Sequence, residues 1–287
     1  MKTHFVFAFL FLMISLLSCS PESSSSSSSS NNSNNLGSFS VNGTEATSPT
    51  ATAVISDNSI AVTLTADNDD ELVIKFNRYG DFLSATLNKP DATTYSSYPY
   101  YAANYFSFNL ESFDDSTRRA KGSFSGKVYL NDGNLTAPYK TVSGTFEVSC
   151  RQVLPTVAGL GASCVINGSQ WRHTDSWRDE VGSEFIYKWI SDDQYMILTS
   201  INGSATLGTF PFTPASTNRF QLAKFDTTTL QYIYYNCTGS YAISSNYLYN
   251  EFLGQKLVSG TFSFTAVNPS DSADQIVVNN GTFKQIF

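Results

Sequence analysis

The 287-residue chain is acidic and rich in aromatic residues, with 17 Lys and Arg against 24 Asp and Glu (net charge −7) and with 22 Phe and 16 Tyr. Binding to nucleic acid needs clustered basic side chains, so this composition predicts no nucleic-acid partner. Charged residues make up 14% of the sequence. So few charges and so many aromatic rings favour half-buried sheets over long solvated helices.

Residues 1–18 have the layout of a secretory signal peptide. After Lys2, the run from Phe5 to Leu17 is apolar except for one serine, and it is shorter than the about 20 residues that a transmembrane helix needs. The sequence Leu-Leu-Ser-Cys that ends at Cys19 resembles the lipobox of bacterial lipoproteins, which implies cleavage before Cys19 and lipid on its sulfur. We therefore expect a membrane anchor at Cys19 and a place in the cell envelope, on either face of the outer membrane. Ordinary secretion with cleavage nearby is the alternative.

The residues after Cys19 are predicted to form a flexible tether over 19–37. An unbroken serine run from Ser23 to Ser30 is followed by an Asn-rich stretch. Such a composition has no apolar side chains to bury and stays solvated.

Two motifs occur twice in the rest of the chain. The segment Phe39–Glu45 returns as Cys164–Gln170, each with Asn-Gly at its centre, and Lys140–Val148 returns as Lys256–Phe264. This repetition predicts two related domains, 38–151 and 164–287. The stretch between them contains one proline and two glycines and is predicted to be a linker over 152–163.

The motifs of the second copy resemble a family of Bacteroidota surface lipoproteins. They are Asn167-Gly168 followed by Trp171, then Lys256–Phe264, then the Asn-Gly-Thr-Phe sequence at 280–283. The resemblance implies an exported, β-rich domain and supplies no activity. The first copy has no Trp after its Asn-Gly and no final Asn-Gly-Thr-Phe, so it is interpreted as diverged or truncated.

Alternation with a period of two dominates both halves. Alternate apolar residues in Ile60–Leu64 and Leu72–Phe76 predict two strands, and the acidic turn Asp67–Asp70 between them predicts a hairpin. The predicted fold is all-β, with two tandem antiparallel domains, each a β-sandwich or a partly closed β-barrel, since alternation does not separate these forms. The matched glycines Gly144 and Gly260 are predicted to mark a bulge or a close approach of strands.

Few residues are available for catalysis. His173 is the one histidine after the signal segment, and it is interpreted as a surface residue. Because triads and zinc sites commonly rely on histidine, no catalytic residue, metal or cofactor is predicted. Three cysteines remain beyond Cys19, and a disulfide between Cys150 and Cys164 across the linker is one hypothesis. The alternative is three small buried thiols.

Acidic pairs could hydrolyse glycosides without histidine. They fall where turns are expected, so they are interpreted as solvated. The oxygen ligands of Asp67–Glu71 would also suit calcium. The candidates are Asp67–Glu71, Asp114 with Asp115, Asp179 with Glu180, and Asp192 with Asp193.

Tyrosines gather in two segments and are candidate binding residues, because an exposed ring can stack on a sugar or anchor a protein. A role in the core is the alternative reading. The candidates are Tyr98, Tyr100, Tyr101, Tyr234 and Tyr235. We expect a non-enzymatic, lipid-anchored surface protein that binds a glycan or a protein. The alternatives are a carboxylate-dependent glycoside hydrolase and a purely structural envelope component.

Overall fold

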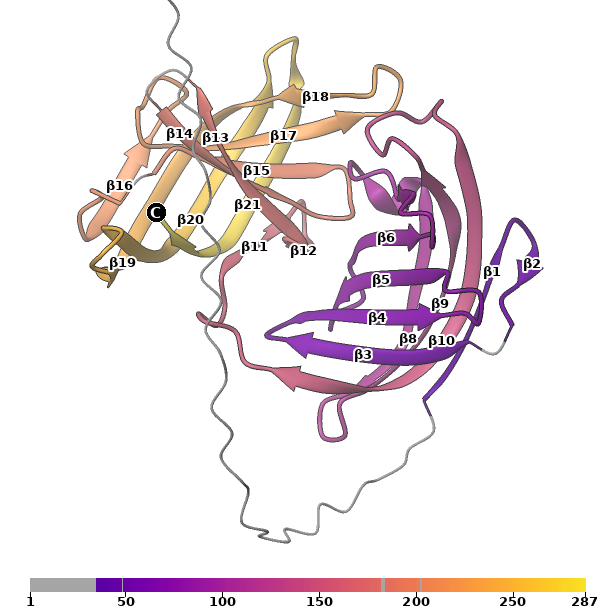
Figure 1. The fold of residues 1–287 in the computed structure, drawn as a ribbon. Helices are drawn as coiled ribbons and strands as arrows, with labels where there is room; N and C mark the ends of the chain where they lie inside the picture. The colour runs from indigo at the N-terminus through magenta and orange to yellow at the C-terminus, as the bar shows by residue number, and fades with distance from the viewer. Residues whose placement is uncertain (1–34, 48, 182–183, 202) are drawn as a thin grey trace, which may run out of the picture. The chain divides into compact units, whose positions relative to one another are not determined.

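Strands make up nearly all of the regular structure (Figure 1). The computed structural model describes residues 35–47, 49–181, 184–201 and 203–287. Cys19, the predicted signal segment and most of the predicted tether lie outside the described residues. The all-β prediction is confirmed, with a single three-residue 3-10 turn, η1 (Ala102–Asn104), among the described residues. No helix in this part of the chain is long and apolar enough to cross a membrane.

Ten strands, which we call the first half, form one sheet in the order β2-β1-β10-β3-β4-β5-β6-β7-β9-β8. Their bounds are β1 Leu36–Val41, β2 Thr44–Glu45, β3 Thr50–Ser56, β4 Ser59–Thr65, β5 Glu71–Asn77, β6 Phe82–Asn88, β7 Thr94–Ser96, β8 Phe106–Asp114, β9 Arg119–Tyr129 and β10 Tyr139–Val153.

The long strand β10 closes this sheet into a ring. One edge of β10 pairs with β9, and the other pairs with β1 and then, in parallel, with β3. At the far end β7 meets β9 at Ser96 and Tyr129. The first half is therefore the barrel-like alternative that the sequence left open. The parallel β10–β3 pairing corrects the expectation of purely antiparallel strands.

The predicted hairpin over Ile60–Phe76 is confirmed as β4 and β5. The inward residues of both strands are no more than 1% exposed and belong to one apolar core. Each such side chain contributes roughly 1.5–3 kcal/mol when buried, which explains why the alternation was a reliable signal. These residues are Ile60, Val62, Leu64, Leu72, Ile74 and Phe76.

Eleven strands, which we call the second half, form two sheets in the orders β12-β11-β21-β20-β19-β16 and β13-β14-β15-β17-β18. Their bounds are β11 Gly161–Ile166, β12 Ser169–Arg172, β13 Asp175–Val181, β14 Glu184–Ile190, β15 Tyr195–Thr199, β16 Gly208–Phe212, β17 Phe220–Asp226, β18 Gln231–Tyr234, β19 Asn236–Asn250, β20 Gln255–Asn268 and β21 Asp271–Ile286.

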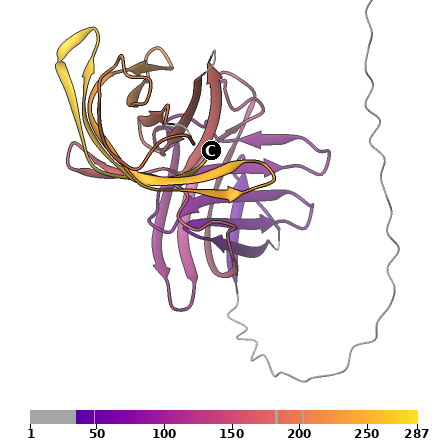
Figure 2. The same ribbon diagram turned by 90° about the vertical axis from the view of Figure 1, so that its left-hand side faces the viewer.

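The two sheets of the second half share one core. Phe220 of β17 stacks on Phe262 of β20 with 4.3 Å between ring centroids, and Trp189 of β14 lies 6.3 Å from Phe283 of β21. Figure 2 shows how the long strands β20 and β21, in yellow, bend along their length. The second half is therefore a sandwich-like pair of sheets, whereas the first half is a single closed one.

Both halves place an opening hairpin beside the last strand of a three-stranded meander. The first half has the order β2-β1-β10-β9-β8 and the second β12-β11-β21-β20-β19. The hairpin turns also agree: Asn42 and Gly43 have φ of 52° and 79°, and Asn167 and Gly168 have 47° and 87°. Positive φ at both central residues is what an Asn-Gly hairpin turn requires.

Glycine and phenylalanine face each other across neighbouring strands of the first half. Gly122 of β9 lies opposite Phe146 of β10, and Gly144 of β10 lies opposite Phe124 of β9. A methyl group added to Gly144 would come within 2.6 Å of the Phe124 ring. The predicted special role of Gly144 is therefore a close approach and not a bulge.

The second half has the same reciprocal arrangement of glycine and phenylalanine. Gly260 of β20 lies opposite Phe283 of β21, and Gly281 of β21 lies opposite Phe262 of β20. In strand order, β10 corresponds to β21 and β9 to β20. The segment Lys140–Val148 thus occupies the place of the final strand, and the interpretation that the first copy lacks this strand is wrong.

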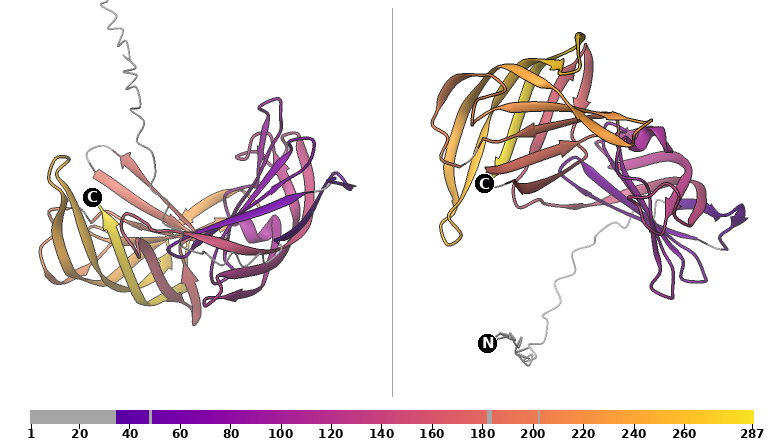
Figure 3. Two further views of the ribbon diagram at one scale, coloured as in Figure 1. Left: turned by 60° about the horizontal axis from the view of Figure 1, so that its bottom comes forward. Right: turned by 90° about the horizontal axis from the view of Figure 1, so that it is seen from above.

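Three predicted boundaries change. β1 begins at Leu36, inside the predicted tether 19–37. β10 continues to Val153 and β11 begins at Gly161, so the connection between the halves is 154–160 and not 152–163. In the described residues no strand of one half pairs with a strand of the other, and Figures 1 and 3 show the two groups of strands separately.

Candidate functional site

The tyrosine-rich segment of the first half packs against the second half. Tyr98 is buried, and its ring lies 6.1 Å from that of Phe225 in β17. Tyr100 stacks on Phe225 and meets Tyr232 of β18 edge-on at 5.8 Å. We call these four residues, together with Tyr101, Tyr105 and Tyr129, the junction cluster. Tyr98 and Tyr100 therefore occupy the interior of the junction, which is the core role that the sequence offered as the alternative to binding.

Tyr101 and Tyr235 border a cavity of about 400 Å³. The Tyr235 ring is 1% exposed, and its hydroxyl donates to Asp274 Oδ2 at 2.6 Å. This hydrogen bond, with one from Asn268, lowers the pKa of Asp274. Tyr234 is 44% exposed and belongs to neither the cluster nor this cavity. The five candidate tyrosines are thus divided among three environments and do not form one platform.

The turn Asp192–Asp193, between β14 and β15, forms polar contacts with the first half. The backbone N–H of Phe82 donates to Asp192 Oδ2 at 2.9 Å, and that of Ala103 donates to the Asp192 carbonyl at 2.9 Å. Asp81 of the first half lies 3.8 Å from Arg172 of the second. Asp192 is therefore a structural acceptor that holds the two halves together.

Burial of this turn shifts both carboxyl groups. Desolvation, together with the negative charges of Asp192 and Asp81, raises the pKa of Asp193 to about 7. Desolvation also raises the pKa of Asp192. The interpretation of this acidic pair as solvated is therefore wrong, because both residues are only partly exposed and their burial disfavours the ionised form.

The other acidic sets differ from one another. Asp114 accepts hydrogen bonds from Ser116 and Thr117 in an exposed turn, and these bonds lower its pKa to about 2. This is the solvated turn that the sequence predicts. Asp179 forms an ion pair with Lys188 at 2.5 Å.

In the set Asp67–Glu71, for which calcium was considered, one carboxylate already forms an ion pair with a lysine. Asp70 is 6% exposed and pairs with Lys89 at 2.6 Å. Among the residues that the structure describes, no three His, Cys, Asp or Glu side chains are grouped so that they could hold a metal ion.

The three thiols are free and buried. Cys150 belongs to the core of the first half, whereas Cys164 and Cys237 belong to the core of the second. The hypothesis of a Cys150–Cys164 disulfide therefore does not match the structure, and the buried-thiol alternative does. Desolvation raises the pKa of Cys150 to about 11.

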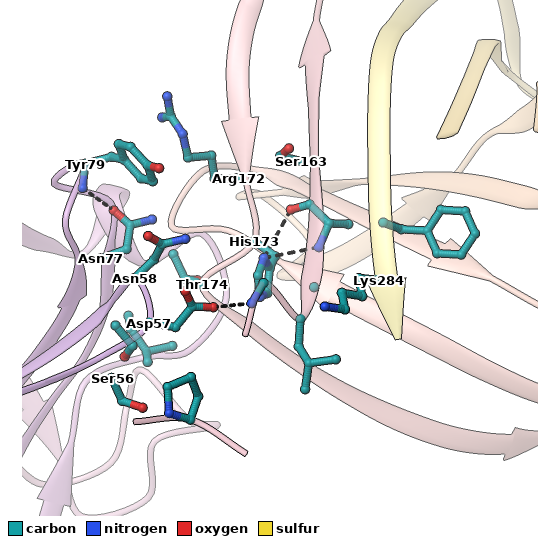
Figure 4. Close-up of a pocket in the computed structure, with 18 of the residues that line it drawn as sticks. Ser56, Asp57, Asn58, Asn77, Tyr79, Ser163, Arg172, His173, Thr174 and Lys284 are labelled. Carbon is teal, nitrogen blue, oxygen red and sulfur yellow. Dashed lines mark hydrogen bonds between the residues drawn. The ribbon is translucent and has the colours of Figure 1, made fainter. Parts of the chain in front are cut away.

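A groove of about 520 Å³, which we call the junction groove, is lined by residues of both halves (Figure 4). The first half contributes the turn between β3 and β4 and the turn between β5 and β6. The second half contributes β11, the end of β12 and part of β21, and the connection 154–160 forms one side. Its polar and charged lining residues are Ser56, Asp57, Asn58, Ser59, Asn77, Tyr79, Ser163, Arg172, His173, Thr174, Thr282 and Lys284.

Tyr79 stands on a turn that Asn77 fixes. The Asn77 side-chain oxygen accepts the backbone N–H groups of Tyr79 and Asp81, each at 3.0 Å, and its Nδ2 donates to Asp81 Oδ2 at 2.7 Å. The Tyr79 side chain remains 53% exposed, and the Arg172 guanidinium carbon lies 4.1 Å from its ring centroid. The ring is therefore held in place by its neighbours before any ligand arrives.

His173 fixes the floor of the groove. Its backbone N–H donates to the Ala162 carbonyl at 3.0 Å, and its Nδ1 lies 3.2 Å from the Ala162 nitrogen. A methyl group added to Gly161, which has φ of 114°, would overlap the imidazole. Burial lowers the pKa of His173. The interpretation as a surface residue is thus replaced by a half-buried packing role.

The connection 154–160 is attached to the first half at one point. The N–H of Gly159 donates to Asp57 Oδ2 at 2.5 Å, and Lys284 Nζ donates to the Ala158 carbonyl at 2.8 Å. Asp57 adopts the left-handed region with φ of 54°, which a short polar residue at a turn tolerates. Both contacts hold this segment against the groove.

Comparison with protein-family models, with curated proteins and with solved structures finds no match. Sequence reasoning missed Tyr79, Arg172 and the turn around Asn77. One signal was present: the sequence Asn-Arg-Tyr-Gly-Asp after a strand is a turn composition that leaves its tyrosine in solvent.

Proposed function

We propose that this chain is a non-enzymatic, lipid-anchored protein of the cell envelope that binds a glycan in the junction groove. The composition of the groove carries the proposal, because the exposed Tyr79 ring stands there among amide, hydroxyl and charged side chains. An aromatic face suits the C–H surface of a sugar, and the polar groups suit its hydroxyls. The volume of about 520 Å³ lies in the usual range for small-molecule sites.

Fixed geometry supports this choice over a protein partner. The Asn77 turn and Arg172 hold Tyr79 without a ligand, so binding loses little conformational freedom. Of the five tyrosines proposed as a binding surface for a sugar or a protein, Tyr98 and Tyr235 are buried and cannot take part in an exposed protein interface. A purely structural envelope role would leave the groove without a ligand.

The proposed anchor is Cys19, which lies outside the described residues. We expect the wild-type chain in the membrane fraction and a Cys19→Ser variant in the soluble fraction, because several acyl chains bind a bilayer almost irreversibly. Fractionation with immunodetection checks this. Equal membrane association of both proteins would contradict the anchor, without touching the proposal for the groove.

A glycan array probed with the full chain in detergent tests the binding proposal. We expect Tyr79→Ala to lower affinity for the bound glycan about tenfold, which corresponds to about 1.4 kcal/mol. Tyr247→Ala is the matched control, because Tyr79 and Tyr247 are both 53% exposed and Tyr247 does not line the groove. An array without binding, or equal loss in both variants, would refute the proposal.

A carboxylate-dependent glycoside hydrolase is the second candidate. One observation favours it: a pKa raised to about 7 at Asp193, beside Asp192, is what a general acid needs. Against it, neither residue lines the junction groove, and Asp192 is committed to the N–H of Phe82. Release of reducing sugar from the bound glycan that Asp193→Asn abolishes would establish the hydrolase. Binding without release supports the non-enzymatic protein.

A further inference from the structure

Although the chain as a whole is acidic, cations outnumber carboxylates among the residues that line the junction groove. Its charged lining residues are Arg172, Lys284 and Asp57, two positive against one negative, whereas the whole chain carries −7. The single carboxylate among them is already engaged, because Asp57 accepts the N–H of Gly159. The groups left for a ligand are therefore mainly donors and cations.

Arg172 is positioned as an anion-binding fork. Its guanidinium lies over the Tyr79 ring at 4.1 Å, an arrangement that orients the planar group. The nearest carboxylate, Asp81, is at 3.8 Å, beyond hydrogen-bond distance, and its Oδ2 already accepts from Asn77. No hydrogen bond to another described residue occupies the Arg172 guanidinium, and its side chain is 31% exposed.

Lys284 supplies a second cation from the opposite side of the groove (Figure 4). Its Nζ donates to the Ala158 carbonyl at 2.8 Å, which fixes the ammonium group while two of its three N–H donors stay available. Exposed hydroxyl and amide groups of Asn58 and Thr282 also line the groove. A ligand that fills the site would meet an aromatic ring, two cations and neutral hydrogen-bonding groups.

We propose that the junction groove selects a glycan that carries carboxylates, with Arg172 and Lys284 as the residues that determine this specificity. The inference rests on the proposed glycan-binding function and names its ligand class. Arg172 pairs with a sugar carboxylate through two parallel N–H groups, and Lys284 acts as a point charge. The acidic remainder of the chain repels a long polyanion, so a short segment or a chain end is the part that binds.

Calorimetry with the full chain in detergent and two defined probes tests this. The probes are a uronic-acid tetrasaccharide, tetragalacturonate, and its neutral counterpart, tetragalactose. We expect at least tenfold tighter binding of the acidic probe at low salt. That preference should shrink when NaCl rises from about 0.05 to 0.5 M, because the salt screens the charges, while binding of the neutral probe stays constant.

Variants assign the preference to residues. Arg172→Gln should lower affinity for the acidic probe about tenfold more than affinity for the neutral probe, for which only the support of the Tyr79 ring is lost. Lys284→Gln should give a smaller loss of the same kind, and Arg172→Lys an intermediate one because the charge stays and the fork is lost. Lys121→Gln is the control, since Lys121 is exposed and pairs with Glu111 away from the groove. Circular dichroism checks that each variant is folded.

The outcomes separate the two proposals. Binding of neither probe by the wild-type chain, together with a blank array, would overturn the glycan-binding function itself. Equal binding of both probes, or unchanged preference in folded Arg172→Gln and Lys284→Gln, would overturn the charge selection and leave glycan binding in place. Binding of free galacturonate as tight as that of the tetrasaccharide would reduce the site to a carboxylate site and also contradict the inference.

Discussion

Replacing Asp193 with asparagine should stabilise the protein at alkaline pH. The Asp193 carboxyl has a pKa of about 7 in the fold, against 3.8 ordinarily, because burial and the charges of Asp192 and Asp81 disfavour ionisation. The folded state therefore binds the proton more tightly than the unfolded chain between about pH 4 and 7, and stability falls as the pH rises through this window. Above pH 7 the destabilisation is complete.

The size of the effect follows from the shift. Each pKa unit is worth about 1.4 kcal/mol, so a shift of about 3 units sets an upper limit of roughly 4 kcal/mol. Asparagine keeps a side-chain oxygen to accept the N–H of Tyr195, which Asp193 does at 2.8 Å. We therefore expect Asp193→Asn to be more stable than the wild-type chain at pH 8 by roughly 1–4 kcal/mol, and equal to it at about pH 4.

Urea unfolding followed by tryptophan fluorescence measures this difference, because Trp171 and Trp189 are buried. Asp114→Asn is a control of opposite sign: the Asp114 pKa is lowered to about 2 by its turn, so loss of its charge should reduce stability at pH 8. Equal stability of Asp193→Asn and wild type at both pH values would show that Asp193 ionises freely and would refute the reasoning.

Three further predictions concern packing. Gly260→Ala should cost roughly 1–3 kcal/mol, because a methyl group there would meet a strand backbone and the Phe283 ring, whereas Gly133→Ala, with its nearest atom at 3.6 Å, should change stability by less than about 0.5 kcal/mol. Phe225→Ala should cost roughly 3–5 kcal/mol and speed proteolysis in 154–160, because it empties the junction cluster, and Tyr234→Ala should do neither. The three buried thiols should react with iodoacetamide at pH 8 at least about a hundredfold more slowly in the native protein than in guanidinium, because burial both shields them and suppresses the thiolate.

Chemical unfolding, limited proteolysis and mass spectrometry give the readouts. If Gly260→Ala left the free energy of unfolding unchanged, the two strands could move apart at no cost in stability. Unchanged proteolysis of Phe225→Ala would show that the junction does not depend on its aromatic rings. Fast alkylation of Cys150 or Cys164 in the native protein would contradict the burial of these thiols in the two cores.

Local patterns predicted the local structure of the first half. The alternation in Ile60–Phe76 and the acidic turn within it specify two strands and a hairpin to within a few residues. The closure of the sheet was not predictable in this way. It depends on one strand, β10, with three neighbours, and on a single contact between Ser96 and Tyr129, neither of which leaves a period in the sequence.

The candidate site was mostly beyond sequence reasoning for the same reason. Tyr79 and Arg172 belong to different halves, and only the packing of the halves brings them together. Asp192 and Asp193 sit in a turn, where acids are usually solvated, and the N–H of Phe82 that binds Asp192 comes from the other half. The Gly-x-Phe motif occurs on two adjacent strands of the second half, β20 and β21. Comparison of the two sequences therefore paired Lys140–Val148 with β20, although its place in the sheet corresponds to β21.

The opening hairpins have a consequence for how the chain acquires its structure. Leu36 of β1 lies opposite Glu147 of β10, and Gly161 of β11 lies opposite Lys284 of β21. In each half the first strand of the chain therefore pairs with the last. Contacts so distant along the chain carry a large loop-closure entropy and make folding slow. Until β21 arrives, β11 exposes an unpaired edge to other polypeptides. An emerging chain would therefore benefit from a chaperone that shields this edge.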